Sequence, residues 1–333
     1  MGTTKSWTCF LFLIFIGCGP AEIIPSLTDH PDNKKPKASL LDQMQKEKRY
    51  GKGALLLTKF QSFKELQKVI QIEYFDNVGR PNPFFKNSPM VRVTHLSGDQ
   101  NVTSILKSGV SQSDFTNARD GGLGAKIKLV LKSPFSVWIR KDLQRIYILS
   151  RWRPIYFKEG DVAFYDLAKA MMLHISDYDR KKMSPEDLGE KGYINTFNHM
   201  TNQAIITSIF SERLAELIAD AHERFSMPEL ITGEFTEEQI ADLETGPTDN
   251  YVDIINNAWG QELGKQLKEK YKIDRNTVWT PKLLASYLND IQQYGSRAFQ
   301  IGFDPFCETE EVVIRFSDKL NRVIRDKSLV KGL

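Results

Sequence analysis

The spacing of apolar residues predicts a series of helices in the second half of the chain. From about Val162 onward, apolar positions recur every three or four residues, the period at which side chains share one face of a helix. Thr280-Pro281 marks a clear helix start, because proline suits the first helical turn. The predicted helices cover residues 161–175, 195–210, 212–225, 236–244, 250–271, 280–295 and 309–326.

A mixed pattern is predicted for about residues 50–160. Apolar spacing indicates a helix within residues 62–75. Alternation and β-branched content predict short strands at 89–96, 126–133, 135–142 and 145–157.

A glycine-rich stretch, "RDGGLGAKIK", occurs within this mixed part at residues 119–128. A phosphate-binding loop needs a strand before it and a helix after it. Because the sequence predicts a strand after these glycines, we interpret them as a turn.

These patterns together predict an α+β, mostly helical fold. A small mixed α/β region at residues 50–160 precedes a helical domain at residues 161–333. No internal repeat is apparent.

The N-terminus has the pattern of an export signal. Lys5 precedes an apolar run from about Thr8 to Ile16, which Gly17-Cys18 closes. This run is too short to cross a hydrocarbon core of about 30 Å, so it is typical of a signal peptide and not of a membrane helix. An ordinary secretory signal is one interpretation.

The ending Phe15-Ile16-Gly17-Cys18 resembles the bacterial lipoprotein signal, in which cleavage leaves a diacylated Cys. The resemblance implies a signal peptide at 1–17, lipidation of Cys18, and attachment to a membrane through this anchor. Residues 18–49 contain four prolines and few large apolar residues, which is the composition of a flexible tether. Gly19 stands where an Asp signals inner-membrane retention in some bacteria, so the outer membrane is favoured over the inner one.

The charge balance and the cysteine content limit which partners, disulfides and metal sites we expect. The chain has 45 basic and 42 acidic residues, a near balance that predicts no nucleic-acid binding. Of its three cysteines, Cys9 would leave with the signal and Cys18 would be acylated. Cys307 alone remains, so we expect no intramolecular disulfide and no Cys-based metal site.

Three of the predicted helices carry polar groups on faces that also carry apolar residues. Projection at about 100° per residue places His199 on one stripe with Asn195, and His222 on the inward face of the next helix with Glu223 at its flank. On a third helix, one face carries Asp253, Asn256, Asn257, Gly260 and Gly264. The two glycines would let a neighbouring helix approach closely.

The ordered segments "GYINTFNHMTNQA", "ADAHERF" and "DIINNAWGQELG" resemble an uncharacterised bacterial domain family over residues 162–265. Its pattern is Asn-x-x-x-His, then Ala-His-Glu, then Asp-x-x-Asn-Asn-x-x-Gly. The resemblance implies these signature positions: Asn195, His199, His222, Glu223, Asp253, Asn256, Asn257 and Gly260. It names a domain and not a reaction.

Three hypotheses follow for these residues. In the first, they form a satisfied polar network that holds the helices together. In the second, His199, His222 and Asp253 bind a divalent metal such as zinc, and Glu223 is the general base of a metal-assisted hydrolase. In the third, no metal is needed. His222 and Glu223 are then a catalytic acid–base pair, and substrate is bound by Asn195, Asn256 and Asn257.

The sequence thus predicts a lipid-anchored protein of the bacterial cell envelope, with either a hydrolase or a binding and scaffold role. An enzyme requires an open pocket that exposes the signature residues. A non-enzymatic module requires those residues to be buried and an exposed patch to bind an envelope partner. The aromatic residues of "RWRPIYF" at 151–157 are the first candidate for such a patch.

Overall fold

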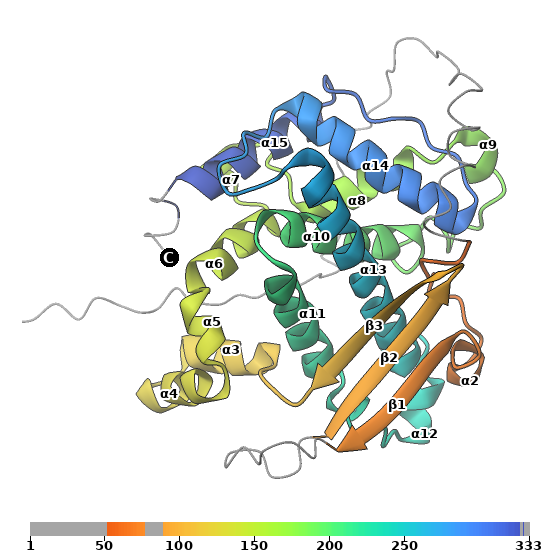
Figure 1. The fold of residues 1–333 in the computed structure, drawn as a ribbon, viewed down its shortest axis with the longest axis vertical. Coiled ribbons are helices and arrows are strands. Elements are labelled where there is room, and N and C mark those ends of the chain that lie inside the picture. The colour runs from red at the N-terminus through yellow and green to blue at the C-terminus, as the bar shows by residue number, and fades with distance from the viewer. Residues whose placement is uncertain (1–51, 77–88, 327–328, 330–333) are drawn as a thin grey trace, which may run out of the picture.

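The computed structural model describes residues 52–76, 89–326 and Leu329. With 58% helix and 10% strand, it confirms the predicted mostly helical α+β fold (Figure 1). The predicted signal peptide, Cys18 and the predicted tether lie outside the described residues.

A three-stranded antiparallel sheet forms the first part of the fold. It consists of β1 (Ile70–Asp76), β2 (Pro89–Ser97) and β3 (Gln100–Lys107), paired in the order β1-β2-β3. Gly98 has a φ of 62°, a left-handed conformation that suits the tight turn between β2 and β3. One face of the sheet packs on the long helix α13, where Trp259 Nε1 donates a hydrogen bond of 3.0 Å to His95.

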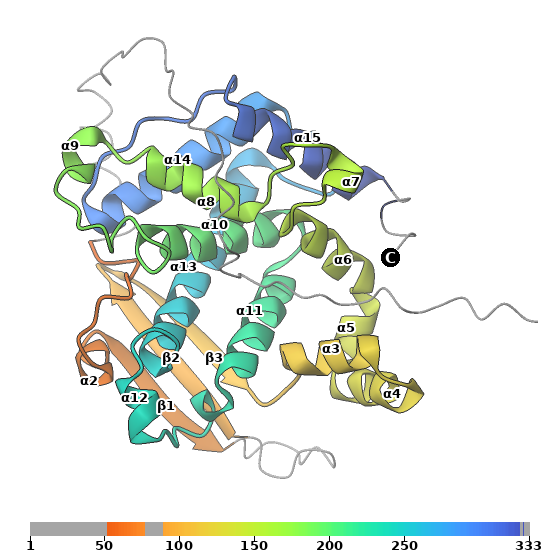
Figure 2. The same ribbon diagram turned by 180° about the vertical axis from the view of Figure 1, so that it is seen from behind.

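Helices form the rest of the described chain (Figures 1 and 2). They are α2 (Phe63–Leu66), α3 (Gln112–Asp120), α4 (Leu123–Lys132), α5 (Pro134–Trp138), α6 (Arg140–Leu149), α7 (Pro154–Phe157), α8 (Phe164–Leu173), α9 (Asp177–Arg180), α10 (Tyr193–Ile209), α11 (Glu212–Ser226), the 3-10 turn η1 (Pro228–Leu230), α12 (Glu237–Ala241), α13 (Pro247–Tyr271), α14 (Pro281–Phe299) and α15 (Glu311–Arg325).

All seven helices predicted after residue 160 are present, with ends close to those expected. Side-chain caps explain two of the starts. Ser211 Oγ accepts a hydrogen bond from the backbone N–H of Leu214, and Thr280 Oγ1 accepts one from that of Leu283. Thus local sequence signals set the beginnings of α11 and α14.

Several predictions for residues 50–160 were wrong. The strand at 89–96 is confirmed as β2, but residues 126–133, 135–142 and 145–157 lie mainly in α4, α5, α6 and α7. Short apolar runs fit the strand and helix periods equally well, so alternation misassigned them. The helix predicted within 62–75 ends at Leu66, and the rest of that segment becomes β1.

The glycine-rich stretch at 119–128 joins two helices. Gly122 precedes α4, so a helix does follow, contrary to the prediction of a strand. Helix α3 comes before it, however, where a phosphate-binding loop would follow a strand. We therefore keep the interpretation as a turn, but the reason is now the helix before the glycines and not a strand after them.

Helices α10 and α13 lie at the centre of the molecule. Helix α8 packs against α10 on one side, and the sheet packs on α13 (Figures 1 and 2). A single hydrophobic core runs from Val91 of the sheet through Ile255 of α13 to Phe316 of α15. Among the described residues, no helix combines the length and apolar character needed to cross a membrane.

Two glycines of α13 make the contact with α10 unusually close. A Cβ built on Gly260 would lie 2.7 Å from the carbonyl oxygen of Met200, and one on Gly264 would lie 2.6 Å from that of Ala204. Real Cβ atoms do not approach backbone oxygens so closely. The expectation that these glycines allow close helix packing is confirmed.

We predict that Gly260→Ala lowers the free energy of unfolding by about 1–3 kcal/mol, because its methyl group would force the α10 and α13 backbones apart. The matched control is Gly124→Ala in α4, where an added Cβ meets nothing within 4 Å. That substitution should leave stability unchanged or raise it by up to about 1 kcal/mol. Urea unfolding of both variants tests this, and equal effects would contradict it.

Candidate functional site

His199 is the centre of a buried polar network between α10 and α13. Its Nδ1 lies 2.9 Å from Oδ1 of Asn257, and its Nε2 lies 3.1 Å from Oδ2 of Asp253. Burial lowers the pKa of His199, but the charge and hydrogen bonds of Asp253 and Asn257 outweigh this and raise it above 6.5. Both nitrogens face acceptors, so the geometry suits the doubly protonated imidazolium.

The asparagines predicted to bind substrate all have partners within the protein. Asn195 Nδ2 donates to Asp253 at 3.0 Å, and Asn257 accepts from His199. Asn256 pairs with the backbone of Leu56: its Oδ1 accepts from the N–H and its Nδ2 donates to the carbonyl, both at 2.9 Å. Asn256 therefore fastens the first described segment to α13.

His222 and Glu223 are less fully engaged. His222 is half-buried, and its Nδ1 lies 3.3 Å from Oε1 of Gln112. Burial, and then the nearby charge of His199, lower the pKa of His222 to about 4, so its ring is neutral at pH 7. Glu223 is 1% exposed, and neither of its carboxyl oxygens has a hydrogen-bond partner among the described residues.

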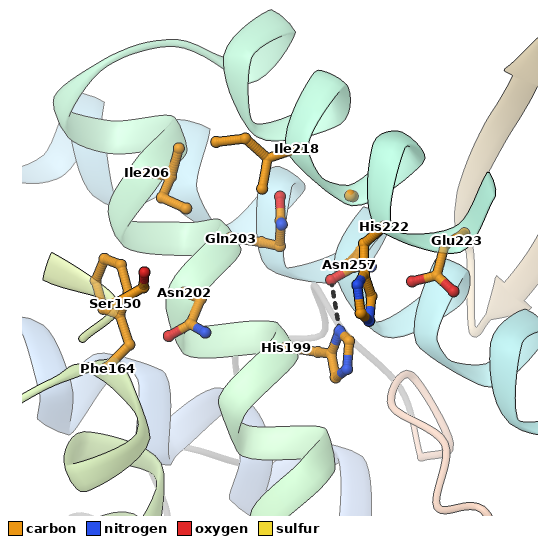
Figure 3. A pocket seen from close by; sticks show the side chains of 11 residues that line it. Ser150, Phe164, His199, Asn202, Gln203, Ile206, Ile218, His222, Glu223 and Asn257 are labelled. Carbon is orange, nitrogen blue, oxygen red and sulfur yellow. Dashed lines mark hydrogen bonds between the residues drawn. The ribbon is translucent and has the colours of Figure 1, made fainter. Parts of the chain in front are cut away.

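A small cavity lies between α10, α11 and α13 (Figure 3). Its polar lining comes from Ser150, His199, Asn202, Gln203, His222, Glu223 and Asn257. The volume of about 10 Å³ is near the minimum for one water molecule, whereas ligand pockets measure about 300–1,000 Å³. The cavity thus lacks room for a substrate in this conformation.

Several buried carboxyl groups converge on this region. Burial raises the pKa of Glu223 well above 4.5, and the charges of Asp253, Asp249 and Asp220 add to the effect. Burial and Asp253 raise the pKa of Asp249 to about 7, although Lys191 opposes this at 3.4 Å. Burial raises the pKa of Asp220 to about 6, against the attraction of Arg224. Near neutral pH the protonated form is therefore favoured most clearly at Glu223.

The predicted metal ligands are not arranged as a metal centre. Within residues 52–76, 89–326 and Leu329, no three His, Cys, Asp or Glu side chains form a group that could hold a metal ion. His199 and Asp253 instead pair with each other, and His222 is turned to Gln112. The set of His199, His222 and Asp253 therefore stays a prediction, and in this conformation protein partners contact both nitrogens of His199.

The sequence analysis missed three residues of this region. Asp249 lies one helical turn before Asp253, and that spacing of four could have revealed it. Gln112, the partner of His222, carries no such signal because it comes from α3, far away in the chain. Arg224 reaches from α11 to the carbonyls of Lys107 and Val110, at 2.5 and 2.8 Å, and so ties α11 to the end of the sheet.

Comparison with protein-family models, with curated proteins and with solved structures found no match. The resemblance to a bacterial domain family thus rests on the three sequence segments alone, and it stays a prediction.

We predict that Asp249→Asn stabilises the protein more at pH 8.5 than at pH 5. An acid whose pKa is raised in the folded state opposes folding once the unfolded chain ionises, above about 3.8. The resulting loss of stability grows with pH and reaches its full value above about pH 7. Removing the charge should therefore add on the order of 1–3 kcal/mol more stability at the higher pH.

The control for this experiment is Asp242→Asn. Hydrogen bonds from Thr245 and Glu244 lower the pKa of the exposed Asp242, so its contribution is lost only as the pH falls below about 3.8. Its effect on stability should not change between pH 5 and 8.5. Thermal unfolding at both pH values measures this, and parallel profiles for the two variants would contradict the assignment of Asp249.

Proposed function

We propose that this chain is a lipid-anchored protein of the bacterial envelope whose folded body serves as a binding or scaffold module. In this proposal the polar signature is a structural network and not an active site. The observation that carries it is His199, whose two ring nitrogens both contact buried side chains of α13. A residue engaged in this way is not available to a substrate.

Most of the signature residues connect separate segments. Asn195 and His199 link α10 to α13, and Asn256 links α13 to Leu56. Such groups are costly to bury without partners, and here the partners lie on other elements. Their arrangement supports a role in fixing how the helices pack.

The location in the envelope is supported by the N-terminal sequence. The signal-like run and Cys18 resemble the lipoprotein pattern, and the proline-containing tether would separate the folded body from the bilayer. Gly19 favours the outer membrane in this proposal. The partner of the module is an envelope component and not a nucleic acid, since the 45 basic and 42 acidic residues of the chain nearly balance.

One observation favours a second candidate function, metal-free acid–base catalysis. His222 and Glu223 lie side by side at the cavity (Figure 3). The first is a neutral base, and the second is a protonated acid whose oxygens have no hydrogen-bond partner in the described part of the chain. Catalysis would require the cavity to open. A hydrolase screen in which Glu223→Gln abolishes turnover without loss of stability would favour this candidate.

We predict that His199→Ala lowers the free energy of unfolding by about 3–5 kcal/mol, because Asp253 would lose its buried partner. The control is His222→Ala, which removes a single long hydrogen bond at a half-buried position and should cost about 1 kcal/mol. The double variant His199→Ala/Asp253→Ala should recover part of the loss. Equal stability of the parent and His199→Ala would refute the network.

We expect radiolabelled palmitate to enter the chain in bacterial cells and to disappear in Cys18→Ala. The variant should also leave the membrane fraction, since it has no acyl chains to anchor it. Cys9→Ala and Cys307→Ala are matched controls and should keep the label. Label retained in Cys18→Ala would rule out the anchor at this position.

A further inference from the structure

A stripe of apolar side chains faces solvent on α4. Leu123, Ile127, Val130 and Leu131 are 75%, 50%, 44% and 54% exposed. Their spacing places them within about 100° of one another around the helix. Leu129, which is buried, points away from this stripe toward the body of the protein.

The next helix along the chain, α5, carries a further exposed apolar residue. Trp138 at its end is 86% exposed. Helix α5 is held to the body by Arg213 of α11, whose guanidinium lies 3.9 Å from the ring centre of Phe135. We name the five exposed side chains Leu123, Ile127, Val130, Leu131 and Trp138 the α4–α5 surface.

Isolated exposed apolar residues are normal in proteins, but a contiguous group of large ones marks an interaction site. On α4 the buried Leu129 lies on one side of the helix, and the wider apolar stripe lies on the opposite side. Packing within the described protein therefore does not account for the stripe.

The segment that carries this surface has charged residues of one sign only. Residues 123–141 include Lys126, Lys128, Lys132, Arg140 and Lys141 and contain no acidic residue, although the whole chain is nearly balanced. At about 100° per residue, Lys126 and Lys128 fall on opposite flanks of the apolar stripe. Lys132 pairs with Asp114 at 2.7 Å.

We propose that the α4–α5 surface docks on an anionic lipid bilayer. An apolar stripe with lysines on both flanks can enter the headgroup region while the lysine side chains reach the lipid phosphates. An exposed Trp is suited to the same depth, because its ring is apolar and its N–H is polar. Anionic phosphates also complement Lys126, Lys128, Arg140 and Lys141, the cations of the segment other than Lys132.

The position of the surface fits a planar partner. Helices α3, α4 and α5 form the edge of the molecule, away from the central helices α10 and α13 (Figures 1 and 2). This inference goes beyond the proposed lipid anchor and does not depend on it. An anchor would hold the chain near a bilayer, whereas the α4–α5 surface would set which side of the folded body faces it.

Hydrogen–deuterium exchange of the full chain tests the proposal, because it reports on each segment separately. The chain is mixed with vesicles of phosphatidylglycerol and phosphatidylethanolamine, or of phosphatidylcholine alone. On the anionic vesicles, amides of residues 123–141 should exchange on the order of tenfold more slowly. Helix α12 is the internal control and should not change. High salt should reduce the protection, because it screens the lysines.

A matched pair of variants isolates the surface. Leu131 and Val278 are both 54% exposed, so each should tolerate Asp with little change in thermal stability. Leu131→Asp should abolish the protection by vesicles, whereas Val278→Asp should preserve it.

Three results would overturn the proposal. Vesicle-bound chain with unprotected 123–141 would show attachment through the N-terminus alone, and would leave the anchor standing. Protection that rises with protein concentration in the absence of vesicles would assign the surface to a second copy of the chain. Equal protection on neutral and anionic vesicles would show that the lysines do not contribute to binding. Loss of palmitate labelling in Cys18→Ala bears only on the anchor.

Discussion

The close approach of the α10 and α13 backbones is the constraint on which the rest of the interior depends. It is possible because Gly260 and Gly264 present no side chain to Met200 and Ala204. At that separation His199 reaches Asp253 and Asn257 directly, and Asn195 reaches the other oxygen of Asp253. Two larger residues in place of Gly260 and Gly264 would move these polar groups out of contact with one another. The groups would then be buried without hydrogen-bond partners, which is costly.

The same close packing creates an electrostatic conflict that the protein resolves only in part. Asp249, Asp253 and Glu223 are buried near one another, and His199 together with Lys191 supplies the opposing charge. Glu223 then favours its neutral form, and neither of its oxygens finds a hydrogen-bond partner in residues 52–76 and 89–326. Buried ionic groups of this kind contribute little net stability, but they penalise alternative packings strongly. This is the property expected of a network that specifies one arrangement of three helices.

The interior and the surface therefore suggest different roles. Inside, the polar residues are used by the protein itself, and the cavity they line has a volume of only about 10 Å³. Outside, Trp138 and the α4 stripe are large apolar groups exposed beside a run of cations. In "RWRPIYF", Trp152, Ile155 and Tyr156 are also exposed, at 52%, 94% and 38%, as expected if that segment were a patch. Contact with the envelope through the exterior fits these observations better than chemistry in the interior.

The sequence by itself determined the α-helices after residue 160 except the short α9, because their apolar period and caps are local signals. It also placed Asp253 and Gly260 on one face of one helix and His199 on a partly polar stripe of another. Only the tertiary structure decided what these residues contact, since the partners Leu56 and Gln112 lie far away in the chain. It also decided that residues 126–157 are mainly helical, because a short apolar run fits a strand or a helix until its neighbours determine which side is buried.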